Sequence, residues 1–550
     1  MNETSSGAAD VQLRNRAAMR MSGLTLLSRL TGFARVIVVA AVLGTSYLGN
    51  VYQSSNAIPN ILFELFAAGA LQSVLVPIMV DAVDRHRRED AEHTAGVVLG
   101  AMGSILAAIV AAGMVAAPWI MGILVSGVDD PAVRDAQVEL GTFLLWFFLP
   151  QIVFYGLNLV ATAVLNARGS FALPVFAPTV NNVVVIATYL LFGAMRGSQP
   201  PSLELTLDEK LVLALGTTAG VVAFCLVPFL GLWRSGFRLV PRFEFRSPIL
   251  RRLARDGSWA AGFLALSQVL LVVVLVLSNR VEGGVVIYQL AFVLFMLPNS
   301  LFAVPVFTTA FPTLTRNQRA GDWGAFAGEV GRATRSIAFL TIASAAALVA
   351  LSEPLADLVA RGNAADRAAE IGAAIAAFAL GLPGYSMILF LTRVSYAYGD
   401  TPPPTLVNLG VAVLGTAAMW SMVAVASDSN VVTAIGLGFS VAQLIGALVL
   451  GLVVRSRLHR EGVRVEDIVV PALRSVVSAS VAAVLAWLAA EAVLSVLASG
   501  SDPLFGSALA VGVGSVVMVA VLLGVQWLLG GPRPMETVRS LGAGRTRAVS

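Results

Sequence analysis

The feature that most constrains this chain is a succession of long apolar stretches separated by short polar connections. About fourteen segments of roughly 20 or more mainly apolar residues can be distinguished, and a transmembrane helix needs about 20 such residues to cross the hydrocarbon core. They lie near residues 21–46, 51–80, 94–125, 138–165, 172–195, 211–233, 257–279, 285–313, 334–351, 369–397, 403–426, 431–454, 471–497 and 505–530. The sequence therefore predicts an all-α polytopic membrane protein.

The composition supports a membrane location and argues against metal chemistry. Hydrophobic residues make up 57% of the 550 residues and charged residues only 12%, with a mean hydropathy of +0.83, outside the range of soluble domains. The single cysteine, Cys225, excludes an intramolecular disulfide. The three histidines, His86, His93 and His459, are scattered over polar connections. We therefore expect no metal site.

Motifs for nucleotide or hydrolytic chemistry are also missing. Glycine-rich stretches lie within spans and lack the lysine of a phosphate-binding loop. No histidine lies at membrane depth to complete a Ser-His-Asp arrangement. The sequence predicts a transporter rather than an enzyme, with no cofactor and no nucleic-acid partner; the membrane potential or an ion gradient is the energy source left open.

The distribution of positive charge predicts the orientation. If the N-terminus is cytoplasmic, most of the 36 basic residues fall in the tails and cytoplasmic connections, as the positive-inside rule requires. The external exceptions are Arg134, Arg196, Lys210, Arg280, Arg361 and Arg367. We expect both termini in the cytoplasm of a bacterium. The densest basic stretch runs from Arg234 to Arg255 and includes "RSPILRRLARDG". It is expected to control topology and to attract anionic phospholipid; an amphipathic helix on the inner leaflet is the alternative.

Two short matches suggest an internal duplication. The segment "IPNILF" (Ile58–Phe63) resembles "LPNSLF" (Leu297–Phe302). The same offset sets Arg29 opposite Gln268. A further segment, "LNARGSFALP" from residue 165, can be laid on "SYAYGDTPPP" from residue 395. Their common order predicts that spans 1 to 6 and 7 to 12 are tandem repeats.

A repeat of six spans keeps its orientation in the membrane. The two copies would then form pseudo-symmetric six-helix lobes related by an axis along the membrane normal, with the substrate path between them. The predicted organisation is a cytoplasmic tail (1–20), an N-lobe (21–233), a basic cytoplasmic linker (234–256), a C-lobe (257–454), two further helices (471–530) and a cytoplasmic tail (531–550).

The first span contains two arginines in the stretch "LSRLTGFARVIVVAAVLG". Counted from Arg20 at 1.5 Å per residue, Arg29 lies about 13 Å deep and Arg35 about 22 Å deep in a core about 30 Å thick. A central arginine raises the insertion free energy by about 2.5–3.5 kcal/mol, so both are expected to face a polar cavity or a partner. Gly32 lies between them around the helix and would leave room for a bulky group. Two guanidinium groups suit a phosphate or diphosphate.

An internal ion pair is the alternative explanation for these charges. Glu64 lies about as far after the turn near residues 45–49 as the arginines lie before it, so an antiparallel second span would bring it near either one. Both interpretations are compatible, because a carboxylate can occupy the site until an anion replaces it. Further candidates for the cavity and its support are Ser28, Asn50, Asn60 and Gln268.

Amide side chains inside other spans have two readings. Asn181 and Asn182 in "APTVNNVVVI", Asn408 in "PTLVNLG" and Gln443 would either line a polar path or form hydrogen bonds between helices. Periodicity alone does not separate the two.

Four motifs resemble one known family. They are "LSRLTGFAR", "NAIPNILFELFAAGALQSVLVP", "LNARGSFALPVFAPTVNNVVVI" and "YGDTPPP". Together they resemble the lipid II flippase family (MurJ or MviN), within the multidrug, oligosaccharidyl-lipid and polysaccharide exporter superfamily. The resemblance implies two six-helix lobes, a groove for the lipid tail formed by spans 13 and 14, and family arginines at Arg29 and Arg35, the latter at the substrate diphosphate.

The chain departs from the better-known branch of that family at four positions. Val36 and Asn50 stand where that branch carries acids, and Glu64 and Val293 stand where it carries arginines. The resemblance therefore implies a less cationic cavity and no sodium site, a pattern that points to an actinobacterial-type branch.

The function implied by the resemblance is a flippase that moves lipid II from the inner to the outer leaflet of the cytoplasmic membrane by alternating access, for peptidoglycan synthesis. The expected partners are lipid II or a similar polyprenyl-diphosphate lipid, membrane phospholipids and cell-wall synthesis or division proteins. Two alternatives are an exporter of another polyprenyl-diphosphate glycan or of drugs, and a scaffold that transports nothing. The arginine pair and the scarcity of intramembrane acids favour an anionic substrate over a cationic drug.

Overall fold

The computed structural model describes residues 3–65, 88–244, 246–463, 468–497 and 502–530. Every regular element in these ranges is helical. The chain divides into two compact units, Met1–Gln268 (unit 1) and Val269–Ser550 (unit 2). The helix α9 (Pro248–Ser278) begins in unit 1 and ends in unit 2.

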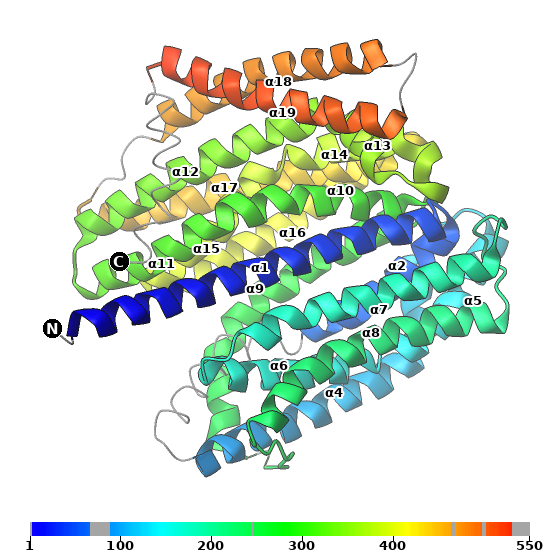
Figure 1. The fold of residues 1–550 in the computed structure, drawn as a ribbon, viewed down its shortest axis with the longest axis horizontal. Helices are drawn as coiled ribbons and strands as arrows, with labels where there is room; N and C mark the ends of the chain where they lie inside the picture. Colours follow the sequence, from blue (N-terminus) through cyan, green and yellow to red (C-terminus); the bar gives the residue numbers. More distant parts are fainter. Residues whose placement is uncertain (1–2, 66–87, 245, 464–467, 498–501, 531–550) are drawn as a thin grey trace. The chain divides into compact units, whose positions relative to one another are not determined.

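Unit 1 is a bundle in which α7 lies between α1 and α8 (Figure 1). In addition, α6 packs on α8, α4 packs on α5 and α6, and α2 packs mainly on α5. The bounds are α1 Glu3–Leu43, α2 Tyr47–Phe63, α4 Arg88–Leu124, α5 Pro131–Phe148, α6 Gln151–Ala167, α7 Ala172–Arg196 and α8 Leu207–Arg234.

Unit 2 contains more short elements. Its bounds are α10 Gly284–Pro298, η2 Asn299–Ala303, α11 Val304–Arg319, α12 Trp323–Ala350, α13 Ser352–Val359, η3 Gly362–Arg367, α14 Ala368–Ala379, α15 Leu382–Tyr398, α16 Pro402–Val423, η4 Asp428–Asn430, α17 Val431–Arg460, α18 Val469–Leu497 and α19 Pro503–Leu528. The helix α17 packs on α14, α15 and α16, and α12 packs on α11, α14, α15 and α18.

Most of the predicted spans fall on long apolar helices. Eleven helices in the described residues are long and apolar enough to cross a membrane, and twelve if the bent pair α14 and α15 forms one span. Of the two other predicted spans, 257–279 contains the shorter apolar helix Gly262–Ser278, and most of 51–80 lies outside the described residues. The prediction of an all-helical polytopic membrane protein is confirmed.

The two units pair their helices in the same order. In unit 1, α7 packs on α8 and α6 packs on α4 and α8; in unit 2, α16 packs on α17 and α15 packs on α12 and α17. The pair α2 and α5 has its counterpart in α10 and α14. This correspondence is what a tandem duplication predicts, so it supports the proposed repeat.

Equivalent turns also share their backbone geometry. Gly169 and Gly399 both have positive φ, +73° and +95°, a conformation that glycine adopts without strain. The backbone N–H after each glycine donates to a helix carbonyl, from Ser170 to Leu165 and from Asp400 to Ser395, at 2.9 Å in both cases. These turns lie in the two segments that the sequence aligns, "LNARGSFALP" and "SYAYGDTPPP".

The aligned "PN" motifs lie at or just before π-helical turns in both units. A π-helical turn follows Asn60 at residues 64 and 65, and another spans Asn299–Ala303. In unit 2 the turn is fixed by Ser386, whose hydroxyl donates to Asn299 Oδ1 at 2.9 Å. Such turns interrupt helices at functional sites in many proteins.

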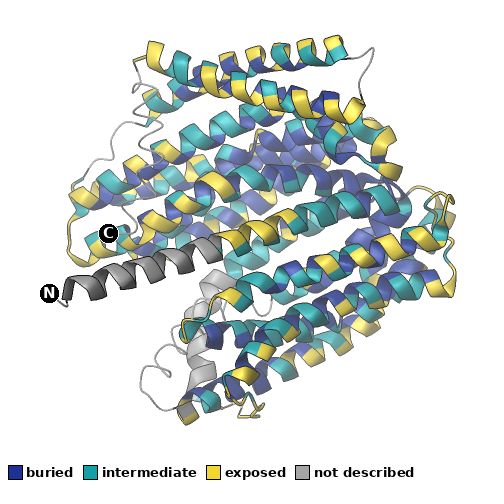
Figure 2. Ribbon diagram, viewed as in Figure 1, coloured by how far each residue is buried: buried dark blue, intermediate teal, exposed yellow. Residues whose placement is uncertain are grey.

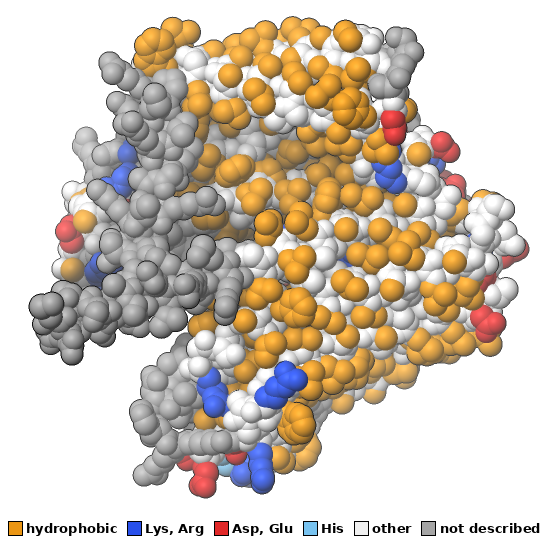
Figure 3. Space-filling model, in the orientation of Figure 1, with side chains coloured by type: hydrophobic (Ala, Val, Ile, Leu, Met, Phe, Trp, Pro, Cys, Tyr) orange, Lys and Arg blue, Asp and Glu red, His pale blue; other side chains and the backbone are white. Residues whose placement is uncertain are grey.

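The helices bury their contacts with one another and expose apolar side chains outward. Buried residues follow the faces where helices meet (Figure 2), and hydrophobic side chains are spread over the middle of the visible surface, with most of the charged ones nearer its edges (Figure 3). Large exposed apolar residues include Trp119, Leu190, Leu226, Val413, Leu448 and Val516. This arrangement suits a lipid environment, in which outward apolar side chains carry no penalty.

The described residues of the basic segment between α8 and α9 contain no separate surface helix. Residues from Pro248 onward form the first turns of the continuous helix α9, so "RSPILRR" is not a separate amphipathic helix. Before it, the extended segment around Arg242 lies on α4, where a side chain at Gly96 or Gly100 would collide with its backbone. The Arg242 backbone N–H donates to Gly96 O at 2.8 Å, which fixes this segment on α4.

The last two helices belong to unit 2. They pack on each other, with α18 also against α12 and α19 against α13 (Figure 1). Their contact is a seam of small buried residues, Ala479, Ala482, Ala486, Ala490 and Ala510. Small residues let membrane helices approach closely.

A glycine-to-alanine exchange at the contact between α15 and α17 is expected to destabilise unit 2. A Cβ at Gly384 would lie 2.6 Å from the backbone carbon of Gln443, so the helices would have to separate. We expect Gly384→Ala to lower the free energy of unfolding by about 1–3 kcal/mol, measured as a lower thermal midpoint in detergent. Gly410→Ala on α16, where nothing lies within 4 Å, is the control. Equal midpoints for the two variants would contradict the prediction.

Candidate functional site

The helix α1 positions both predicted arginines in unit 1. It runs without interruption from Glu3 to Leu43 and packs on α7. On α7, Asn182 Nδ2 donates to Thr31 Oγ1 at 3.2 Å and to the Ser28 carbonyl at 3.5 Å. Asn182 thus forms hydrogen bonds between helices, the second of the two readings of the amide side chains.

Gly32 faces the neighbouring helix. A Cβ at this position would lie 3.5 Å from Asn182 Nδ2, which is ordinary contact distance. The glycine therefore belongs to the contact between α1 and α7, and Arg29 and Arg35 project on its two sides. The expectation that Gly32 leaves space for a substrate group stays a prediction.

Arg35 lies beside three tyrosines of unit 1. It is half-buried and within electrostatic range of the hydroxyls of Tyr52, Tyr155 and Tyr189; we call these residues the tyrosine cluster. Tyr52 Oη is 3.0 Å from Tyr189 Oη and 2.5 Å from Thr217 Oγ1. These neighbours carry hydroxyls and no carboxylate, so they leave the positive charge uncompensated.

Neither arginine has an acidic partner in the described ranges. Arg29 is exposed and Arg35 half-buried, and no ion pair within those ranges joins either one to Glu64 or to another carboxylate. Glu64 is half-buried in the π-helical turn after α2. The structure gives no support to a static pair between Glu64 and the arginines.

The remaining candidates are spread over three helices. Ser28 on α1 and Gln268 on α9 are half-buried. Asn50 on α2 is fully buried, so it supports the interior of unit 1. Asn60, almost three turns later on the same helix, is exposed, and its side chain lies within hydrogen-bonding reach of Tyr155. Asn60 and Arg35 thus approach the same tyrosine.

A third arginine inside a span was not singled out from the sequence. Arg393 lies on α15, within the predicted span 369–397, and is half-buried. Its guanidinium carbon is 4.0 Å from the centre of the Phe307 ring. The sequence feature that could have identified it is the arginine shortly before the "YGDTPPP" motif. Arginines near the end of a span are usually interfacial anchors, so this feature alone does not indicate a functional residue.

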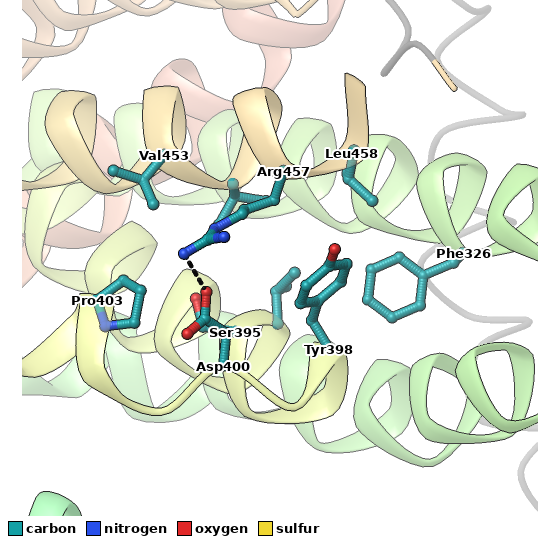
Figure 4. Close-up of a pocket in the computed structure, with 10 residues that line it drawn as sticks. Phe326, Ser395, Tyr398, Asp400, Pro403, Val453, Arg457 and Leu458 are labelled. Atoms are coloured by element: carbon teal, nitrogen blue, oxygen red, sulfur yellow. Dashed lines mark ion pairs between the residues drawn. The ribbon is translucent and has the colours of Figure 1, made fainter. Parts of the chain in front are cut away.

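The "YGDTPPP" motif connects α15 to α16 and contacts the end of α17. It forms a structural contact within unit 2 and not a substrate site. Asp400 and Arg457 point toward one another and form an ion pair at 2.8 Å (Figure 4), and the Tyr398 hydroxyl donates to Glu461 at 2.6 Å. The cavity that these residues line measures about 10 Å³, room for about one water molecule. The motif therefore fixes the turn before α16 against the end of α17.

The fold and the arginines define a class of protein. Two units with corresponding helix pairs, apolar outer surfaces and intramembrane positive charges are those of a multi-helix membrane transporter for an anionic substrate. A family model described as "Lipid II flippase MurJ" matches residues 39–505. The chain therefore belongs to the MurJ lipid II flippase family, and it is a transporter rather than an enzyme.

Individual relatives agree with this membership. The lipid II flippase MurJ of Burkholderia cenocepacia is 27% identical over 445 residues, covering 80% of this chain and 83% of the relative. A solved structure described as "Lipid II flippase MurJ, inward closed conformation" covers 92% of this chain and 99% of its own, with a TM-score of 0.73 and 18% identity. An inward-facing multidrug transporter of the MATE family has a TM-score of 0.65 at 15% identity and covers 81% of this chain and 99% of its own. The last two matches show the shared fold.

Proposed function

We propose that this chain carries lipid II across the cytoplasmic membrane and that Arg29 and Arg35 bind the diphosphate of the lipid. The observation that carries the proposal is the pair of guanidinium groups on one membrane-spanning helix with no carboxylate partner in the described ranges. An uncompensated charge at that depth is maintained at a free-energy cost, which a bound anion would offset. A diphosphate accepts planar, paired hydrogen bonds from guanidinium groups.

The neighbours of Arg35 fit this role. A carboxylate would compete with the diphosphate for the guanidinium, whereas the hydroxyls of the tyrosine cluster remain neutral. Tyrosine hydroxyls can also donate hydrogen bonds to phosphate oxygens. Asn60, exposed beside Tyr155, would extend this polar surface toward the substrate, and Glu64 and Gln268 would lie in its surroundings.

The orientation, partners and branch are further parts of the proposal. The charge distribution supports cytoplasmic termini, and the matching helix pairs of the two units support two lobes of six helices. The groove for the lipid tail would involve α18 and α19. Val36 and Val293 support an actinobacterial-type branch. Phospholipids and cell-wall synthesis or division proteins are the proposed partners beside lipid II.

A depletion strain tests the function directly. Cells that lack their own lipid II flippase would receive this chain, and the lipid II in the outer leaflet would be measured with a membrane-impermeant probe. We expect the chain to restore outer-leaflet lipid II and growth. An empty vector is the control. Absence of outer-leaflet lipid II while the chain is present in the membrane would refute the proposal.

A further inference from the structure

Arg393 is an intramembrane charge that the proposed function does not yet use. It lies on α15, five residues before the end of the helix at Tyr398, which corresponds to about 8 Å along the axis. No ion pair in the described ranges involves its guanidinium. An arginine within a membrane span and without a counter-charge indicates a functional site.

The side chain of Arg393 points away from the nearer end of the helix. Its Nη1 donates to the backbone carbonyl of Leu389 at 3.1 Å, one turn nearer the middle of the span. An arginine that anchors a helix to phospholipid headgroups extends the opposite way, toward the interface. This direction argues against a role as an interfacial anchor.

The guanidinium is held by an aromatic ring. It lies over Phe307 of α11, a residue only 1% exposed, at a distance suited to a cation–π contact. This contact and the bond to Leu389 leave most of the guanidinium donors for another acceptor. The ring fixes the orientation of the group, which lowers the entropy lost when an anion binds.

Arg393 belongs to one half-buried stripe of α15. Tyr385, Leu389, Arg393 and Tyr396 recur at helical spacing, and all four are half-buried. Arg393 is within electrostatic range of the hydroxyls of Tyr385 and Tyr396. The stripe therefore combines one positive charge with two neutral hydroxyls.

The same combination occurs in unit 1. The alignment of "LNARGSFALP" with "SYAYGDTPPP" lays Tyr155 of α6 on Tyr385 of α15. Arg35 lies near Tyr155, and Arg393 lies near Tyr385. The two arginines lie on different helices, α1 and α15. Each unit therefore has a positive charge near the corresponding tyrosine, although the arginines themselves do not correspond.

We propose that Arg393, seated on Phe307 and flanked by Tyr385 and Tyr396, is a second anion-binding residue that takes a phosphate oxygen of the transported lipid diphosphate. This inference rests on the proposed function. Phosphate could also come from an ordinary phospholipid headgroup, so the test must separate these two sources.

Binding measurements on the full-length protein in neutral phosphatidylcholine nanodiscs make this separation. The probes are undecaprenyl diphosphate and, separately, cardiolipin. We expect Arg393→Gln to weaken undecaprenyl diphosphate binding about tenfold and to leave cardiolipin binding unchanged. Arg393→Lys, which keeps the charge and loses the planar fork, is expected to bind with intermediate affinity. Arg332→Gln removes an exposed arginine of the same unit and is the matched control.

The outcomes separate this inference from the proposed function. Unchanged diphosphate binding by both Arg393 variants would overturn the inference, and so would an equal loss of diphosphate and cardiolipin binding, which indicates a general phospholipid contact. If the wild-type protein does not bind undecaprenyl diphosphate more tightly than cardiolipin, the proposed function itself fails. If Arg35→Gln weakens diphosphate binding and Arg393→Gln does not, the proposed function stands and Arg393 has no part in it.

Discussion

An Arg35→Ala variant is expected to reach the membrane in normal amounts and to lose the ability to support peptidoglycan synthesis. The guanidinium lies beside the tyrosine cluster without a carboxylate in the described ranges, so its removal breaks no ion pair there. What it would remove is a charged contact with the diphosphate. Hydrogen bonds to charged groups contribute about 1.5–3 kcal/mol, which corresponds to about 10- to 100-fold weaker binding. The measurement is growth of the depletion strain together with the amount of lipid II in the outer leaflet.

Companion variants separate substrate binding from structural pairing. Arg35→Lys keeps the charge and should retain part of the activity, because ammonium lacks the planar paired donors. Arg234→Ala removes an exposed arginine at the end of α8 and should leave activity unchanged. If Glu64→Gln damaged function as severely as Arg35→Ala, a pair between these residues would be the better explanation. Normal growth with Arg35→Ala would exclude the diphosphate role.

The span pattern was predictable because it depends on local composition. A helix in lipid satisfies its own backbone hydrogen bonds, so apolar length alone indicates a span. The equivalence of the turns in "LNARGSFALP" and "SYAYGDTPPP" was predictable for a similar reason. Each turn has a glycine at the position with positive φ, Gly169 and Gly399. The break between α14 and α15 and the π-helical turn at Asn299–Ala303 were not predictable, since they depend on contacts such as that from Ser386.

For the candidate site, the sequence reveals the type of each residue and its depth in the membrane, but not which neighbours it contacts. Arg29 and Arg35 were identified because their depth makes them costly. The neighbours of each α1 residue depend on how α1 is rotated about its axis against α7. In the structure this rotation places Gly32 against Asn182. Arg393 was missed for the same reason. A position near the end of a span is typical of an interfacial anchor, and only the bond to the Leu389 carbonyl and the contact with the Phe307 ring reveal where the side chain lies.

A Glu209→Gln variant is expected to lose much of the stability of the connection between α7 and α8. Glu209 forms an ion pair with Arg196 at 3.4 Å, and the two side chains are only 9% and 8% exposed. Arg196 also donates to the carbonyl of Pro200 at 2.7 Å and to the Ser202 hydroxyl at 3.1 Å. Neutralising one partner leaves the other charge buried, which destabilises a protein by about 3–5 kcal/mol. The thermal midpoint in detergent should fall, and hydrogen exchange of residues 197–206 should accelerate.

The amide of Glu209→Gln still offers an oxygen to the backbone N–H of Thr206, which donates to the Glu209 carboxylate at 2.7 Å in the native protein. The variant therefore isolates the charge from the helix cap. The control is Glu329→Gln, which breaks an ion pair with an arginine that is 68% exposed and should change stability by at most about 1 kcal/mol. Removing both buried charges while keeping the cap, Arg196→Met with Glu209→Gln, should recover most of the lost stability, because no unpaired charge remains. A double variant less stable than Glu209→Gln alone would show that the ion pair itself, rather than the uncompensated charge, determines the effect.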